Sequence, residues 1–366
     1  MKTTALKGDT AWIQWAVKEI RADYARSSDT HLLKCVLPVL EQHDIHLYFK
    51  DESTHPTRSL KHRLARSLFL HGLCSGWIRQ DQPIIEASSG STAVSEAYFC
   101  RLLGLPFIAV VPEDISPNKI KEIEFFGGQI TRTSASDIYD RAIQLSDDLD
   151  GYYMDQFVRA EQATDWRGNN NIAESIFQQL IHEKYSVPRY VVVGAGTGGT
   201  SATIGRYIRY FLLDGERPKL IVADPERSVF FDYFRTGDDT LTSDISGRIE
   251  GIGRPRVERS FIRDVIDDVV CVPDAASVAS LRFIEGLLGK KVGGSTGTNV
   301  FAVLGLISQM IQSRTPGSIV TLLCDDGERY TDTYYSDHWL QEQGLDIAPY
   351  FERIEQFADT GKLELT

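Results

Sequence analysis

Apolar and polar residues follow one another along the chain in an order that predicts strands alternating with helices. From residue 84 onward, short apolar runs with the length of buried strands are each followed by a polar turn and a segment with helical spacing. The predicted strands here are 84–87, 107–111 and 129–133, and the predicted helices after them are 92–103, 119–126 and 136–149. Ser136 is the expected N-cap of the last helix, because its hydroxyl can accept a backbone N–H.

Further apolar runs predict strands at 45–50, 190–193, 219–223 and 318–323, and an amphipathic pattern predicts a helix at 10–25. A chain that alternates strands and helices in this way builds a mainly parallel sheet covered by helices. We therefore expect an α/β protein. The chain holds no clear linker, so two lobes that pack on each other fit the sequence better than separate domains.

Composition and charge exclude several classes of function. The 366 residues are 42% hydrophobic and 25% charged, an ordinary balance for a soluble globular protein. The net charge of −12 disfavours nucleic acid and anionic membranes as partners, since both need clustered positive charge. No apolar run approaches the ~20 residues that span a bilayer, and the first residues lack the apolar stretch of a signal peptide.

The five cysteines are Cys35, Cys74, Cys100, Cys271 and Cys324. They are odd in number and widely spaced, and they form neither a CxxC pair nor a cluster with histidine. We therefore expect no metal site. Reduced thiols indicate a reducing compartment, and we expect the protein in the cytoplasm.

Lys61 lies in a segment with catalytic potential, His55–Arg63, between the predicted strand 45–50 and an apolar helical pattern at 64–70. The positive end of a helix dipole makes a lysine easier to deprotonate. A deprotonated amine can attack a carbonyl carbon. An ordinary solvent-exposed lysine at a helix start fits the same pattern, so this segment alone does not decide between the two interpretations.

Gly194–Thr200 follows a predicted strand and opens a helix. Such glycines let backbone N–H groups converge with the helix dipole on an anion, typically a phosphate. No Gly-Lys-Ser/Thr follows, so the loop is not a P-loop. It matches Gly-x-Gly-x-x-Gly, but Asp224 lies too far along the chain to be the usual ribose partner. A phosphate cup, a dinucleotide loop and a simple tight turn remain open.

Two other loops share a design of strand end, small or hydroxyl residues and helix start, namely 86–93 and 292–299. The first can offer N–H and O–H donors to a carboxylate, although a serine-rich N-cap explains it equally well. Loops of this kind in an α/β protein meet at the carboxyl edge of the sheet. Together with Lys61, they provide what pyridoxal phosphate (PLP) and an amino acid require.

With these loops and Lys61 in one chain, the sequence resembles the fold-type II PLP enzymes of the cysteine synthase and cystathionine β-synthase family. The resemblance covers roughly residues 28 to 340 and rests on five motifs in the family's order. They are Pro56-Thr57-Arg58-Ser59-Leu60-Lys61, Ser88-Ser89-Gly90-Ser91-Thr92-Ala93, Gly196-Thr197-Gly198-Gly199-Thr200, Glu250-Gly251-Ile252-Gly253 and Gly293-Gly294-Ser295-Thr296-Gly297.

The resemblance implies a two-lobed, tryptophan synthase β-like fold. Residues 1–54 and 161–366 would form the large PLP-binding lobe, and 55–160 a smaller mobile lobe. Lys61 would hold PLP as a Schiff base and move protons at Cα. The other implied cofactor-binding residues are Ser91, Gly196, Thr197, Gly198, Gly199, Thr200 and Ser295. The implied substrate-binding residues are Ser88, Ser89, Gly90, Ser91, Thr92, Gln156 and Gly251.

The chain departs from the cysteine synthase pattern at three places. Ser91 stands where asparagine is usual, Arg58 is bulky, and the 158–176 segment resembles that of the cysteine desulfhydrase branch. This implies β-elimination on L-cysteine to sulfide, pyruvate and ammonia. The alternative is β-replacement, which forms L-cysteine from O-acetylserine and sulfide. A non-catalytic regulatory homologue is a third hypothesis, which the intact Lys61 disfavours. The family also implies a homodimer.

Overall fold

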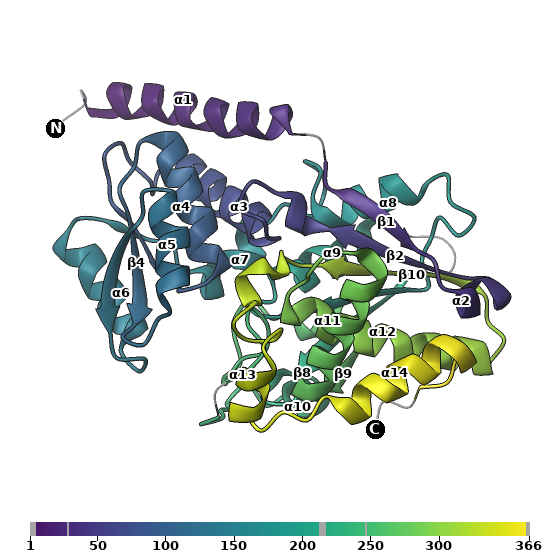
Figure 1. Cartoon of the computed structure of the whole chain (residues 1–366). Helices are drawn as coiled ribbons and strands as arrows, with labels where there is room; N and C mark the ends of the chain where they lie inside the picture. The colour runs from purple at the N-terminus through teal and green to yellow at the C-terminus, as the bar shows by residue number, and fades with distance from the viewer. Residues whose placement is uncertain (1–4, 28, 212–216, 246, 364–366) are drawn as a thin grey trace. The chain divides into compact units, whose positions relative to one another are not determined.

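The computed structural model describes residues 5–27, 29–211, 217–245 and 247–363, with side chains from residue 9 onward (Figure 1). The chain divides into two compact units. The smaller unit comprises Met1–Asp29 and His55–Thr164, and the larger unit comprises Thr30–Thr54 and Asp165–Thr366.

The smaller unit contains a four-stranded parallel sheet in the order β5-β4-β3-β6. Its strands are β3 (Ile84–Ala87), β4 (Phe107–Pro112), β5 (Gln129–Thr133) and β6 (Tyr152–Tyr153). Its helices are α1 (Ala5–Arg26), α3 (Lys61–Cys74), α4 (Ser91–Leu103), α5 (Pro117–Phe125), α6 (Ile138–Asp148) and α7 (Gln156–Ala163).

Helices cover both faces of this sheet. Ile85 and Val110 point to the face covered by α6, where they pack around Ala142. Residues of alternate parity, such as Ile84 and Ala109, point to the other face and join the core formed by α1, α3, α4, α5 and α7. This period of two is what a strand buried on both sides requires.

The first 29 residues belong to the smaller unit, which differs from the expected division at 1–54. The reason is that α1 packs on α3 and α4. Its buried residues Ala16 and Ile20 join Phe69 and Phe99 in one hydrophobic core. The second boundary falls after Thr164 rather than after residue 160.

The larger unit contains a six-stranded sheet in the order β1-β2-β10-β7-β8-β9, which is parallel except for the edge pair β1–β2. Its strands are β1 (His31–Cys35), β2 (Ile45–Asp51), β7 (Tyr190–Gly194), β8 (Lys219–Pro225), β9 (Asp268–Val272) and β10 (Gly317–Leu323). Its helices are α2 (Pro38–Gln42), α8 (Ile172–Leu180), α9 (Gly199–Phe211), α10 (Phe230–Thr236), α11 (Asp274–Leu288), α12 (Gly294–Gln312), α13 (Asp337–Glu342) and α14 (Ala348–Thr360).

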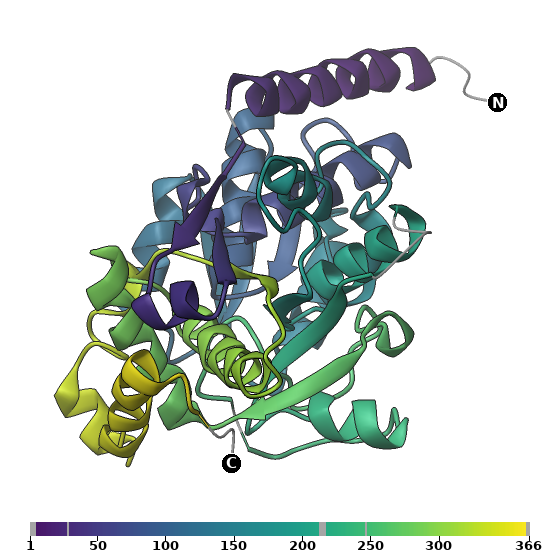
Figure 2. The ribbon, with the colours of Figure 1, turned by 90° about the vertical axis from the view of Figure 1, so that its right-hand side faces the viewer.

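Helix α12 is the centre of the larger unit's core. It packs on β7, β8, β9 and β10 and on α11, and α14 covers α11 and α12 from outside. Val192 and Ile221 face this core, whereas their neighbours in the strands point the other way, where α9 packs on β7 and β8. Figure 2 shows helices on both sides of these strands.

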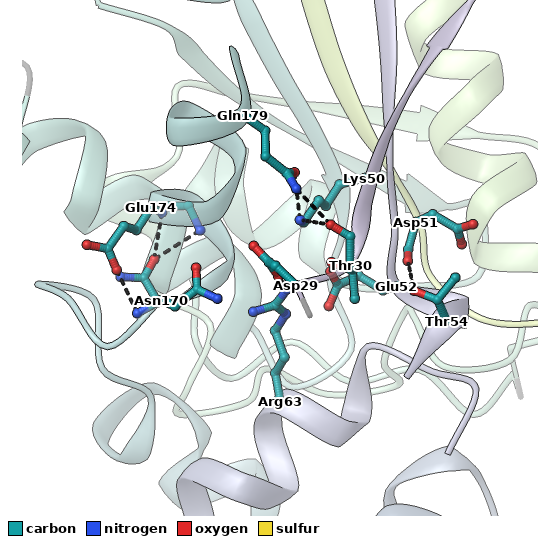
Figure 3. A network of polar contacts seen from close by, with 12 residues as sticks. Asp29, Thr30, Lys50, Asp51, Glu52, Thr54, Arg63, Asn170, Glu174 and Gln179 are labelled. Atoms are coloured by element: carbon teal, nitrogen blue, oxygen red, sulfur yellow. Dashed lines mark hydrogen bonds and ion pairs between the residues drawn. The ribbon is translucent and has the colours of Figure 1, made fainter. Parts of the chain in front are cut away.

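A buried polar network joins the two ends of Thr30–Thr54, the first segment of the larger unit (Figure 3). The ammonium of the fully buried Lys50 donates to the carbonyl oxygen of Thr30 at 2.6 Å and to the side chain of Gln179 at 2.8 Å. Gln179 also donates to that carbonyl, at 2.9 Å, and the Thr30 hydroxyl donates to Glu52 at 2.7 Å. The network thus ties the beginning of β1 to the end of β2.

The structure confirms the predicted α/β class and its mainly parallel sheets. Two local expectations are wrong. Asp137, not Ser136, is the N-cap of α6, and the Ser136 hydroxyl donates instead to the Asp137 carboxylate at 2.9 Å. Val292 forms only an isolated bridge with Asp326, so the start of α12 does not follow a strand. Among the residues that the structure describes, no helix is both long and apolar enough to cross a membrane.

Candidate active site

Lys61 is the first residue of α3, as its sequence context predicts, and its side chain is partly exposed. The preceding turn is tight. Arg58 has a φ of 57° and donates its N–H to the carbonyl of His55 at 2.7 Å. The backbone N–H of Lys61 donates to the Ser59 hydroxyl at 3.3 Å, which holds the start of the helix in place.

A chain of side-chain hydrogen bonds links this turn to the serine-rich loop of the same unit. The Thr57 hydroxyl lies 3.2 Å from Nδ1 of His62 and 2.9 Å from the hydroxyl of Ser95. Ser95 in turn donates to the carbonyl oxygen of Ser91 at 2.8 Å. The segment that carries Lys61 and the 88–92 loop are therefore held together through buried hydroxyls.

The 88–92 loop runs from the end of β3 into the first turn of α4, which begins at Ser91, as the predicted strand and helix imply. Gly90 is the N-cap of α4, and a Cβ placed on Gly90 would meet no atom within 4 Å. The first N–H groups of a helix have no partner within it, so this end of α4 can receive a carboxylate in that open space. Gln156 begins α7 and is buried, and its side-chain oxygen accepts the Thr92 hydroxyl at 2.8 Å.

Two fully buried carboxyl groups, Glu86 of β3 and Glu96 of α4, lie beneath this loop. Glu86 accepts the N–H of Ala87 at 2.8 Å and that of Gln156 at 3.2 Å. Burial raises the pKa of Glu86, and it raises the pKa of Glu96 well above the ordinary value. A charged residue inside an otherwise apolar buried strand is the signal by which Glu86 could have been found in the sequence.

The glycine loop of the larger unit runs from the end of β7 into α9. Gly198 has a φ of 88°, and a Cβ there would clash with the carbonyl of Ser260. A Cβ on Gly196 would clash with the carbonyl of Gly251. The Gly253 N–H donates to the carbonyl of Ala195 at 2.8 Å, so the 250–253 segment lies directly on the loop.

This loop has the features of a phosphate site. The first turn of α9 carries N–H groups without partners inside the helix, and the dipole of this 13-residue helix favours an anion at that end. The Thr197 hydroxyl accepts the Gly199 N–H at 3.2 Å, which shapes the loop from within. The residues present therefore fit the phosphate of PLP.

Ser295 is the second residue of α12 and is buried. The start of α12 is fixed to the end of β10, because the Thr296 hydroxyl accepts the N–H of Cys324 at 3.0 Å. One turn further on, the Asn299 side-chain oxygen would lie 3.4 Å from a Cβ on Gly194. β10 and β7 are neighbouring parallel strands, so Ser295 and the glycine loop lie at the same edge of the sheet.

The dinucleotide interpretation of the glycine loop finds no support at Asp224. Its carboxylate is fully buried and accepts the N–H of Phe231 at 2.9 Å, so it anchors the start of α10. Burial raises the pKa of Asp224 to about 7.

The structure groups the predicted residues within each unit. In the smaller unit it links the Lys61 turn, the 88–92 loop and Gln156. In the larger unit it groups the glycine loop, Gly251 and the start of α12. The supporting residues that were not predicted from the sequence are Thr57, His62, Glu86, Ser95 and Glu96. Their types are common in turns and helices, and only the fold shows that their side chains meet.

Comparison with known proteins supports the predicted family. Residues 29–325 match the family model of the pyridoxal-phosphate dependent enzymes. The chain is 54% identical to the L-cysteine desulfhydrase Cds1 of Mycobacterium tuberculosis, over 92% of both chains. It is 31% identical to cysteine synthase B of Campylobacter jejuni, over 80% of this chain and 93% of that one.

Solved structures agree with the fold. A hydrogen sulfide-producing enzyme from Fusobacterium nucleatum superimposes with a TM-score of 0.73 at 24% identity, over 90% of this chain and 95% of that chain. An O-ureido-L-serine synthase superimposes with a TM-score of 0.70 at 21% identity, over 85% and 96% of the two chains. The predicted family and its likeness to the desulfhydrase branch are confirmed: the chain belongs to the pyridoxal-phosphate dependent enzymes.

Proposed function

We propose that this protein is a carbon–sulfur lyase that converts L-cysteine and water into hydrogen sulfide, pyruvate and ammonia. The observation that carries the proposal is the 54% identity to an L-cysteine desulfhydrase over 92% of both chains. The residues that depart from the cysteine synthase pattern, Ser91 and the 158–176 segment, also favour elimination over β-replacement.

The smaller unit would supply the reactive amine and the carboxylate site. Lys61 would hold the cofactor through its amine and, once displaced by the substrate, accept the Cα proton. Ser88, Ser89, Gly90, Ser91 and Thr92 would bind the α-carboxylate at the start of α4, together with Gln156. The Thr92–Gln156 hydrogen bond supports this assignment, because it orients both side chains.

The larger unit would supply the cofactor's anchors. Gly196, Thr197, Gly198, Gly199 and Thr200 would bind its phosphate, and Gly251, whose carbonyl lies against Gly196, would border the substrate. Ser295 would contact the ring nitrogen, and Ser91 of the smaller unit the ring's hydroxyl oxygen. When bound, PLP supplies an electron sink that acidifies the Cα–H of an amino acid. A serine does not force the ring nitrogen to be protonated, which favours elimination over transamination.

The reaction balances as a β-elimination followed by hydrolysis, with Lys61 as the group that accepts the proton. The Cα proton passes to Nζ of Lys61, the Cβ–S bond breaks, and the sulfur leaves as sulfide, which takes up a proton. The three-carbon remainder reacts with water, and pyruvate and ammonia are released. We further propose that the protein acts as a cytoplasmic homodimer on a small amino-acid substrate, with neither nucleic acid nor a membrane as partner.

The test is to incubate the holoenzyme with L-cysteine and to quantify sulfide, pyruvate and ammonia in the same samples. The proposal predicts the three products in equal amounts, in continuous turnover. Sulfide without pyruvate would contradict elimination, and the absence of all three products would reject the proposed function. Size-exclusion chromatography with light scattering tests the homodimer, which a monomeric mass would refute.

A further inference from the structure

Glu86 and Glu96 form a buried pair that the reaction itself does not use. Both side chains have 0% of their surface exposed. The two oxygens of Glu86 are each occupied, Oε1 by the N–H of Ala87 and Oε2 by the N–H of Gln156. These two N–H groups belong to the two segments that carry the proposed carboxylate-binding residues.

Glu96 has a different environment. Neither of its oxygens accepts a hydrogen bond from an N–H or O–H donor of the described residues. Its carboxyl group instead meets that of Glu86 within hydrogen-bonding reach. Two carboxylates cannot donate to each other, so the contact requires a proton on one of them. Two adjacent carboxyl groups in a buried site share a proton for the same reason in other proteins.

The charged and titratable groups around the pair do not remove this requirement. Asp155 lies near Glu86 and adds negative charge. Arg159 is the nearby cation, but its guanidinium donates to the carbonyls of Tyr153 and Met154, both at 2.9 Å. The other titratable neighbours are Tyr152, Tyr153 and Cys100, whose pKa values burial raises, so they are neutral at pH 7. The pair therefore lies in a site that favours a single negative charge over two.

We propose that Glu86 and Glu96 share one proton and act as a positioning pair, which holds the 88–92 loop and Gln156 in the geometry that binds the substrate's α-carboxylate. This inference rests on the proposed substrate class. With the shared proton, Glu86 still accepts the hydrogen bonds from the N–H groups of Ala87 and Gln156, and the pair carries only one negative charge behind the loop. Loss of the proton adds a second charge there, which repels Glu96 from Glu86 and weakens binding of an anionic group at the start of α4.

The kinetic test compares Glu96→Met and Glu96→Gln in the holoenzyme. Glu96→Met leaves Glu86 without its proton-sharing partner, and we expect KM for L-cysteine to rise about tenfold with little change in kcat. Glu96→Gln restores a donor to Glu86, so we expect it to bring KM at neutral pH back toward the wild-type value. In the wild type we expect KM to rise at alkaline pH as the shared proton is lost, beyond the change that ionisation of L-cysteine causes in any variant. In Glu96→Gln we expect this additional rise to be absent, because an amide does not ionise.

Phe99→Leu is the matched control, because Phe99 lies on α4 in the same core and makes no polar contact with the pair. It is expected to lower stability and to leave the alkaline rise of KM in place. If Glu96→Gln shows the same rise of KM as the wild type, or if Phe99→Leu shows the smaller rise expected of Glu96→Gln, the positioning role is refuted.

A spectroscopic readout separates this inference from the proposed function. Infrared difference spectra between wild type and Glu96→Gln need no substrate. We expect the C=O stretch of one protonated carboxyl group in the wild type at pH 7 and its absence in Glu96→Gln. No such band would mean that both groups are ionised and would overturn the shared proton, whether or not sulfide is produced. A band in an enzyme that releases no sulfide would leave the shared proton standing and reject the proposed function.

Discussion

The Thr92 hydroxyl donates a 2.8 Å hydrogen bond to the side-chain oxygen of Gln156, and both residues are buried. Thr92 belongs to the first turn of α4, and Gln156 begins α7, 64 residues later in the sequence. Because Gln156 also donates its backbone N–H to Glu86, the starts of α4 and α7 are fixed to each other at the end of β3.

Thr92→Val should raise KM for L-cysteine about fivefold to tenfold, because it leaves the buried Gln156 oxygen without its donor while keeping the shape of the side chain. The effect on kcat should be small. Thr92→Ser retains the hydroxyl and is the control. Steady-state kinetics of the two variants check the prediction, and equal KM values for them would contradict it.

Lys61→Ala should reduce sulfide release by at least about 1000-fold, because no other group is assigned to accept the Cα proton. The visible absorption of the covalently held cofactor should disappear in the same variant. Arg58→Ala, at an exposed position three residues earlier, is the control and should retain the absorption band. Sulfide release by Lys61→Ala at a rate within tenfold of wild type would remove Lys61 from the mechanism.

Gly198→Ala and Gly90→Ala should have different consequences. At Gly198 the φ of 88° and the clash with Ser260 should cost about 1–3 kcal/mol of stability and reduce PLP content after purification. At Gly90 the added Cβ meets no protein atom within 4 Å, so the melting temperature should not change. KM for L-cysteine should rise in Gly90→Ala, because the methyl group occupies the space proposed for the carboxylate. Reversed effects of the two substitutions would contradict both assignments.

Asp224 should make the free energy of unfolding pH-dependent. Burial raises its pKa in the folded state to about 7, above that of the unfolded chain. The folded protein therefore binds more protons than the unfolded chain between pH ~4 and ~7, and stability contributed by Asp224 falls as pH rises through this window, by up to about 1.4 kcal/mol per pH unit. Asp224→Asn keeps an acceptor for Phe231 and should lack this slope. Urea titrations of both proteins at pH 5 and pH 7.5 check this prediction. If the free energies of unfolding of wild type and Asp224→Asn differ by the same amount at both pH values, the prediction is refuted.

Much of the fold could be predicted from the sequence, because buried strands and the helices after them have distinct periods. The strands 84–87 and 129–133 occur with the predicted bounds. The first helix was also predicted, but its amphipathic pattern shows only that it packs on something, not that its partners are α3 and α4. Val292 was misassigned because an apolar residue before glycines resembles a strand end, whereas its backbone makes only one bridge.

The candidate site was predictable where it rests on backbone geometry and not where it rests on side-chain contacts. At Gly196 and Gly198 a Cβ would clash with a backbone carbonyl, so glycine is required there. The resulting glycine spacing is visible in the sequence. The contact between Glu86 and Glu96 leaves none, because residues ten positions apart on a strand and a helix are not related by any period. The Thr57–Ser95 hydrogen bond is hidden for the same reason.

The most direct test of the proposed desulfhydrase activity is to measure kcat/KM of the holoenzyme for two reactions under the same conditions. One is release of sulfide from L-cysteine, and the other is formation of L-cysteine from O-acetylserine and sulfide. For a cysteine desulfhydrase we expect sulfide release to have the larger kcat/KM and to yield pyruvate in equal amount. Efficient formation of L-cysteine from O-acetylserine, with only slow sulfide release from L-cysteine, would contradict it and identify β-replacement as the main reaction.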